Sequence, residues 1–171
     1  MAGGVLALDL SSHAGWAIGR LPARPLTLME AAVAKPPQPL SGVAHFSGEV
    51  GPFLIAFEEW MNSMFDQHRP TGVIYESPVL PTLTTPQTVM KLMGLAGVLV
   101  MVCHRRRIQW VRQAQPSTVK LYFSGSGAKG KDNVKNACRA RGWTVEDDNE
   151  ADALALLDYA AFLYADERRA A

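Results

Sequence analysis

The stretch LALDLSSHAGWAIG, residues 6–19, decides the expected fold of this 171-residue chain. The apolar run at 3–10 predicts a buried strand, SSHAG a turn, and WAIGR a second strand that pairs with the first as a hairpin. Asp9 interrupts the apolar run of the first strand. Aspartate is depleted from strands because its short side chain competes for backbone hydrogen bonds, so Asp9 calls for an explanation other than folding.

Beyond the hairpin, the apolar periodicity predicts a single domain over residues 1–171 in which strands and helices are mixed. The proline-rich residues 21–42 have no clear period, and we expect an irregular insertion there, with room for one short strand or helical turn. Further strands are expected at 44–50, 71–77 and 108–112, and helices at 52–69, 87–104, 116–123, 131–142 and 148–166. This order predicts an α/β fold with a mixed sheet and helices on both faces.

The composition excludes several classes of protein. With 48% hydrophobic and 19% charged residues, the chain has the composition of a globular protein. Its longest uncharged apolar run, Leu92–Cys103, is 12 residues, short of the roughly 20 that a membrane helix needs. No basic residue precedes the first apolar stretch, which disfavours a secretory signal. The two cysteines, Cys103 and Cys138, are expected to be buried thiols in a reducing, cytoplasmic compartment, and are too few for a disulfide scaffold or a zinc finger.

Charge is distributed unevenly along the chain. Residues 105–141 hold ten basic residues and one acidic residue, and residues 146–152 hold five acidic ones. Such segregation is typical of a surface that binds a polyanion beside an acidic cluster. Two solvated faces of opposite charge that pair with each other would give the same pattern, so charge by itself leaves both interpretations open.

Three acidic residues lie where folding does not explain them: Asp9, Glu76 at the end of the apolar strand VIYE, and Asp152 in the apolar helix EADALALL. Each one taken singly could pair with a buried arginine or a helix N-terminus. Burying several unpaired carboxylates is costly, so a cluster of them indicates a bound cation. Oxygen ligands select Mg²⁺ or Mn²⁺.

A fourth ligand is expected one turn before Asp152. Asp148 and Asn149 precede it by four and three positions, which places both on its side of the helix. Glu150 points elsewhere and suits the helix dipole instead. Asp148 offers a charge and Asn149 a neutral carbonyl, but Asp148 is also a candidate for the helix N-cap. The choice between Asp148 and Asn149 stays open.

Four stretches in this order resemble the RuvC-type Holliday junction resolvases of the RNase H-like nuclease superfamily. They are LALDLSSHAGWAIG, VIYES, PSTVKLYFSGSGAKGKDNV and DDNEADALALL. The resemblance assigns the family's carboxylates to Asp9, Glu76 and Asp152, and its two functional lysines to Lys120 and Lys131. It spans nearly the whole chain outside 21–42 and implies an RNase H-like mixed sheet of five strands.

The resemblance implies a magnesium-dependent endonuclease that resolves four-way junctions by paired cuts, leaving 5′-phosphate and 3′-hydroxyl ends. Two Mg²⁺ ions about 4 Å apart, for which Mn²⁺ would substitute, are expected on the three carboxylates and the fourth group. Lys131 is expected to stabilise charge on the scissile phosphate, and Lys120 to contact the nearby backbone. Two symmetric cuts imply a homodimer.

The chain departs from the family pattern at two positions. Asn149 stands where the family often has Asp or His. Val79 stands where bacterial members carry an aromatic residue that stacks on junction bases, which implies a different cut-site preference. Short divergent members of this kind occur in phages and prophages, so a bacterial or phage-infected cell is the expected setting.

Other basic residues are expected to contact DNA phosphates without reading sequence. The apolar helix at 87–104 is the expected dimer interface, with an ordinary core helix as the alternative. The expected phosphate contacts are Arg105, Arg106, Arg107, Lys129, Lys135, Arg139 and Arg141.

Three other functions are alternatives to the resolvase. A kinase-like ATPase also begins with an Asp-turn-Gly hairpin, but it needs a second lobe for which 171 residues leave no room. A catalytically silent DNA-binding module of the same fold is disfavoured by the three carboxylates. A less selective nuclease for branched or flap DNA fits the sequence as well as strict four-way resolution does.

Overall fold

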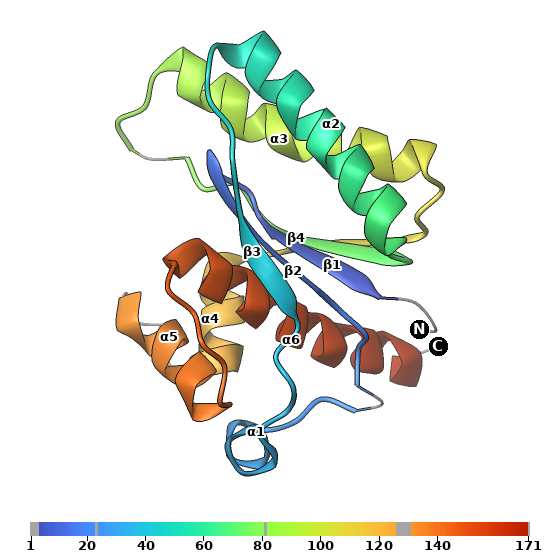
Figure 1. Cartoon of the computed structure of the whole chain (residues 1–171), viewed down its shortest axis with the longest axis vertical. Coiled ribbons are helices and arrows are strands. Elements are labelled where there is room, and N and C mark those ends of the chain that lie inside the picture. The colour runs from blue at the N-terminus through green and yellow to red at the C-terminus, as the bar shows by residue number, and fades with distance from the viewer. Residues whose placement is uncertain (1–3, 23, 81, 126–130, 171) are drawn as a thin grey trace.

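A five-stranded mixed sheet forms the centre of the protein (Figure 1), in a computed structural model that describes residues 4–22, 24–80, 82–125 and 131–170. Its strand order is β3-β2-β1-β4-β5. β2 pairs antiparallel with both β1 and β3, whereas β1, β4 and β5 run parallel. The expected fold class is confirmed. The strands are β1 (Val5–Asp9), β2 (His13–Gly19), β3 (Leu40–His45), β4 (Gly72–Glu76) and β5 (Trp110–Ala114).

Helices cover both faces of the sheet (Figure 1). Because side chains alternate along a strand, Leu6 and Leu8 of β1 enter one core and Val5 and Ala7 the other. The first core lies under α2 (Val50–His68) and α3 (Pro86–Arg105). The second lies under α4 (Pro116–Ser124), α5 (Lys131–Ala140) and α6 (Asp148–Ala170), with α1 (Leu28–Ala34) beside α5.

The helices at 52–69 and 87–104 are confirmed as α2 and α3. Phe53, Phe57 and Met61 bury the apolar side of α2, and Arg69 ends it with a left-handed φ of 48° before Pro70. By length and composition α3 is apolar enough to cross a membrane, with a mean hydropathy of 1.5. Its longest uncharged apolar run, Leu92–Cys103, is nevertheless only 12 residues. One such helix is weak support for a span, and α3 packs on α2 in the core.

The third strand was placed wrongly at 44–50: it runs from Leu40 to His45 and begins inside the proline-rich stretch. Pairing with β2 sets its position, since Trp16 lies opposite Gly42 and His13 opposite His45. A Cβ on Gly42 would lie 3.1 Å from the Trp16 ring, so a larger residue there would need the ring to shift. The turn expected over SSHAG is also shorter, because β2 already begins at His13.

Candidate active site

Two of the three predicted carboxylates end neighbouring parallel strands. Asp9 is the last residue of β1 and Glu76 the last of β4, one position beyond the paired residues Leu8 and Tyr75. Strand alternation places Asp9 on the face of Ala7, and Glu76 on the face of Ile74, which is the face that α6 covers. The carboxyl ends of the two strands therefore bring both acids to one edge of the sheet, beneath α6.

The third carboxylate, Asp152, comes from the start of α6, and Gly15 allows this helix to approach. Gly15 is the β2 partner of Asp9. A Cβ built on Gly15 would lie 1.9 Å from the backbone oxygen of Asn149, so no other residue fits without moving the first turn of α6. Because α6 lies so close to β2, Asp152 lies at the edge of the sheet where β1 and β4 end, beside Asp9 and Glu76.

The three carboxylates interact strongly because they are buried together. Burial, with the negative charge of Asp152 next in importance, raises the pKa of Asp9 to about 7. Burial, followed by the charges of Asp9 and Asp152, raises the pKa of Glu76 to about 8. The pKa of Asp152 is also raised by burial, against the lowering effect of Lys120. Mutually repelling buried acids of this kind are typical of functional sites, which makes this cluster the candidate active site.

Lys120 of α4 is the cation in contact with this cluster. Its Nζ donates a hydrogen bond to Oδ2 of Asp152 at 2.8 Å. Burial acts to lower the pKa of Lys120, but its hydrogen bond and attraction to Asp152, with those to Glu76 and Asp9, outweigh burial and raise it. Among the described residues, Lys120 is therefore the cation that attracts all three carboxylates.

The donor set fits a hard divalent cation. Oε1 of Glu76 is buried with no hydrogen-bond partner among the described residues, and leaving a buried carboxylate oxygen unsatisfied is costly. All three groups offer oxygen ligands, the kind that Mg²⁺ prefers. Within residues 4–22, 24–80, 82–125 and 131–170, however, no three His, Cys, Asp or Glu side chains already form a metal-binding group. Binding would require a local rearrangement of the cluster.

The fourth position differs from expectation. Asp147, which the sequence analysis did not single out, caps α6: its Oδ1 accepts a hydrogen bond from the backbone N–H of Asn149 at 2.7 Å. The N-cap alternative for Asp148 is therefore wrong, and Asp148 instead pairs with Lys135 at 2.6 Å. The negative charge of Asp147 also raises the pKa of Asp9, so Asp147 lies close to the site. An Asp immediately before the first helical turn was the sequence pattern that could have revealed it.

The basic residues of α5 are divided among different environments. Lys135 donates to the backbone oxygen of Glu146 as well as pairing with Asp148, and Arg139 donates to Asn136 of its own helix. The segment 105–141 thus pairs in part with the acids that follow it, as the second interpretation of the charge pattern expected. Lys129 lies outside the described residues, and Lys131 is described only as the first residue of α5.

Arg141 was wrongly expected on the DNA-binding surface. Its side chain is only 2% exposed, pairs with Asp158 at 3.2 Å and lies over the Phe123 ring, 3.8 Å from the ring centroid. The guanidinium group needs this pairing because an unpaired buried charge would be strongly destabilising. Arg141 is therefore part of the core beneath α6.

The three arginines at 105–107 lie at the opposite edge of the sheet from the carboxylates. Arg105 is the last residue of α3, and Arg106 and Arg107 lie between α3 and β5, whereas Asp9 and Glu76 lie at the ends of β1 and β4. Arg105 pairs with Glu58 and Arg106 with Asp66, both on α2, and Arg107 adopts a left-handed φ of 57° in the turn. The structure does not bring these arginines to the candidate site.

Comparison with solved structures identifies the fold. Thermus thermophilus RuvC bound to a Holliday junction substrate matches with a TM-score of 0.71 and 19% identity, over 96% of each chain. The chain has the fold of the RuvC resolvases. A second T. thermophilus RuvC structure gives 0.70 at 17% identity, over 95% of this chain and 96% of that one. The yeast mitochondrial Holliday junction resolvase Ydc2 gives 0.67 at 11% identity, over 96% of this chain and 80% of that one.

The likeness in fold agrees with the motif resemblance found in the sequence. No protein-family model matches the chain, and no curated protein matches it. At identities below one fifth, the RuvC likeness establishes the fold, and the chemistry has to be argued from the side chains.

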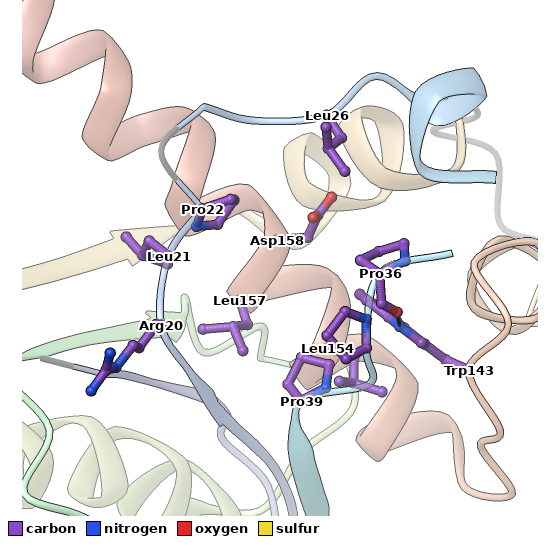
Figure 2. A pocket seen from close by; sticks show the side chains of 11 residues that line it. Arg20, Leu21, Pro22, Leu26, Pro36, Pro39, Trp143, Leu154, Leu157 and Asp158 are labelled. Carbon is purple, nitrogen blue, oxygen red and sulfur yellow. Dashed lines mark hydrogen bonds between the residues drawn. The ribbon is translucent and has the colours of Figure 1, made fainter. Parts of the chain in front are cut away.

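A cavity of about 220 Å³ forms a second feature of this RuvC fold (Figure 2). The proline-rich segment crosses α6 and supplies most of the apolar wall, with Pro22, Leu26 and Pro36 above Leu157 and with Asp158 beside them. Asp158 is already paired with Arg141. The cavity thus lacks the cluster of acids that phosphodiester hydrolysis would use, and the candidate active site remains the edge formed by Asp9, Glu76 and Asp152.

Proposed function

We propose that this protein is a metal-dependent endonuclease that resolves four-way DNA junctions. The observation that carries the proposal is the convergence of Asp9, Glu76 and Asp152, from three distant parts of the chain, on one buried edge of the sheet. The fold supports it, since one RuvC structure that the chain resembles is a complex with Holliday junction substrate.

The three carboxylates, with Asp148 or Asn149, would hold two Mg²⁺ ions or Mn²⁺ in their place. Bound ions of this kind lower the pKa of an attacking water and stabilise the leaving 3′ oxygen. The buried Oε1 of Glu76 supports this role because it has no other partner among the described residues. The chain's own contribution is to bring the acids together at the ends of β1 and β4 and at the start of α6, so that a local rearrangement of their side chains would complete the site.

Basic residues next to the carboxylates would hold the DNA backbone. Lys120 reaches the cluster from α4, and Lys135 reaches the first turn of α6 from α5. We propose that Lys131, at the start of α5, stabilises charge on the scissile phosphate. Lys135 and Arg139 would contact phosphates further along the strand and give affinity without sequence selectivity.

We also propose that the enzyme is a homodimer joined through α3. Met90, Met93 and Val100 are 58%, 51% and 47% exposed and follow one another on one side of this helix. Gly97 lies on the same side, and a Cβ built on it meets nothing within 4 Å. An exposed apolar stripe with a glycine at its centre allows two helices to pack closely across a two-fold axis.

Replacing Met93 with lysine would separate such a dimer. We expect light scattering to show twice the chain mass of 18.6 kDa for the wild type and close to 18.6 kDa for Met93→Lys. Met29→Lys is the matched control, because Met29 is 81% exposed on α1, away from α3. A monomeric wild type, or a Met93→Lys variant that stays dimeric, would contradict this interface.

The nuclease proposal is tested with end-labelled four-way, flap and plain duplex DNA, each with Mg²⁺, with Mn²⁺ and with EDTA. We expect metal-dependent paired cuts in the four-way junction, with 5′-phosphate ends that a ligase reseals. Equal cutting of flaps and junctions would indicate the less selective branched-DNA nuclease. Binding without cleavage under every metal condition would indicate a silent DNA-binding module.

A further inference from the structure

The contact between Lys120 and Asp152 has a consequence for how the site takes up metal. Lys120 Nζ lies 2.8 Å from Oδ2 of Asp152, and the two side chains are 36% and 17% exposed. The pair is therefore partly shielded from water, and its attraction is stronger than that of a surface pair. A side chain expected to contact DNA is instead held within the acidic cluster.

Lys120 is also the cation shared by the whole cluster. Its positive charge acts on Asp9, on Glu76 and on Asp152, and among the described residues it is the cation that acts on all three. It reaches them from α4, a helix that packs against α6. The ammonium group of Lys120 thus supplies part of the positive charge that a bound metal ion would otherwise supply to the three acids.

One ammonium group satisfies the cluster incompletely. It hydrogen-bonds to Asp152, while Oε1 of Glu76 remains buried without a partner among the described residues. A divalent cation carries twice the charge and binds several carboxylate oxygens at once, so it would satisfy the acids better. It would also repel an ammonium group held at hydrogen-bond distance from one of its ligands.

We propose that Lys120 is the internal counter-ion of the metal-free site: its ammonium group neutralises Asp152 until divalent ions bind, and they displace it towards the DNA backbone. This inference rests on the proposed nuclease function. The flexible four-carbon stem of lysine allows the displacement, and α4 itself need not move. Metal binding would then release Lys120 from Asp152 and free it to contact a DNA phosphate. Metal binding and this DNA contact would therefore favour each other.

The first test is Mg²⁺ binding to the DNA-free protein, measured by calorimetry. Lys120→Met keeps the apolar stem and removes the charge, and we expect it to bind Mg²⁺ about tenfold more tightly than the wild type. Lys120→Arg keeps the charge and is expected to stay near the wild type. Lys91→Met is the matched control, since Lys91 lies on α3 across the sheet and bonds to the backbone of Gly48. Unchanged or weaker Mg²⁺ binding by Lys120→Met overturns the proposal.

The second test follows the ammonium group itself by NMR of ¹⁵N-labelled lysine side chains. We expect a protected Lys120 signal without metal, identified by its loss in Lys120→Met, that disappears when Mg²⁺ saturates the wild type. A signal that persists unchanged at saturation overturns the displacement. The two proposals fail separately: a wild type that cleaves junctions but keeps the signal refutes only the counter-ion, whereas a wild type that binds no Mg²⁺ refutes the nuclease proposal as well.

Discussion

Acidic residues near the two ends of the parallel strands have opposite surroundings. At the edge where β4 begins, Asp66 pairs with Arg106 and Glu58 with Arg105, so each acid has its own arginine. At the edge where β1 and β4 end, three acids share Lys120. The hydrogen bond from Arg106 lowers the pKa of the exposed Asp66, whereas burial raises the pKa of Glu76 to about 8.

The two groups of acids differ in their effect on stability: the arginine-paired acids stabilise the fold slightly, whereas the clustered buried acids destabilise it. Exposed ion pairs of the first kind contribute about 0–1 kcal/mol each and are screened by salt. Buried acids in excess of their counter-charges cost free energy, and proteins keep such strain mainly at functional sites. The arginine-paired acids are therefore typical of a structural role, and the cluster of Asp9, Glu76 and Asp152 remains the candidate site for chemistry.

The largest effect is expected from Asp9→Asn. Removing one carboxylate from the cluster should lower the cleavage rate on the order of a thousandfold or more, because the remaining oxygens hold divalent ions poorly. Junction binding in a gel shift should survive, and the metal-free protein should melt at a higher temperature because a buried like charge is gone.

The matched control for this comparison is Asp66→Asn at the other edge. It should leave the cleavage rate within about twofold and change the melting temperature little, because solvent screens this exposed ion pair. Full Mg²⁺-dependent cleavage by Asp9→Asn would show that the underpaired edge is not the active site.

Gly15→Ala should have the next largest effect. The added Cβ would overlap the backbone oxygen of Asn149 at 1.9 Å and push the first turn of α6 away from β2. We expect unfolding by denaturant to show a loss of about 1–3 kcal/mol, and cleavage to fall on the order of a hundredfold as Asp152 moves. Gly51→Ala is the control, since a Cβ there meets nothing within 4 Å and alanine favours the helix. Wild-type cleavage and stability in Gly15→Ala would show that this close approach does not position the site.

The smallest effect is expected from Arg106→Ala. Its partners are Asp66 and Asn62, at the edge far from the carboxylates. We expect a stability loss of about 1 kcal/mol or less, and junction affinity within about twofold of the wild type. If Arg106 contacts a phosphate, as its basic neighbourhood in the sequence suggested, affinity should instead fall and the salt dependence of binding should drop by about one counter-ion.

The sequence by itself determined the features that depend on local pattern. Asp9, Glu76 and Asp152 are each conspicuous as an acid within an apolar element, and the period of Phe53, Phe57 and Met61 predicts α2. The mixed sheet with helices on both faces followed from the order of these elements. Patterns of this kind survive because burial imposes the same spacing on any chain that forms a strand or an amphipathic helix.

Only the tertiary structure decided which partners meet. It placed β3 at Leu40–His45 through its pairing with β2, buried Arg141 against Phe123, and brought Lys120 to Asp152 across 32 positions of the chain. These outcomes depend on contacts between segments far apart in sequence, and no period or composition encodes them. The sequence does not reveal whether a basic residue lies on the surface, in the core or beside a carboxylate. Its burial and its neighbouring charges, which the tertiary structure sets, decide its role.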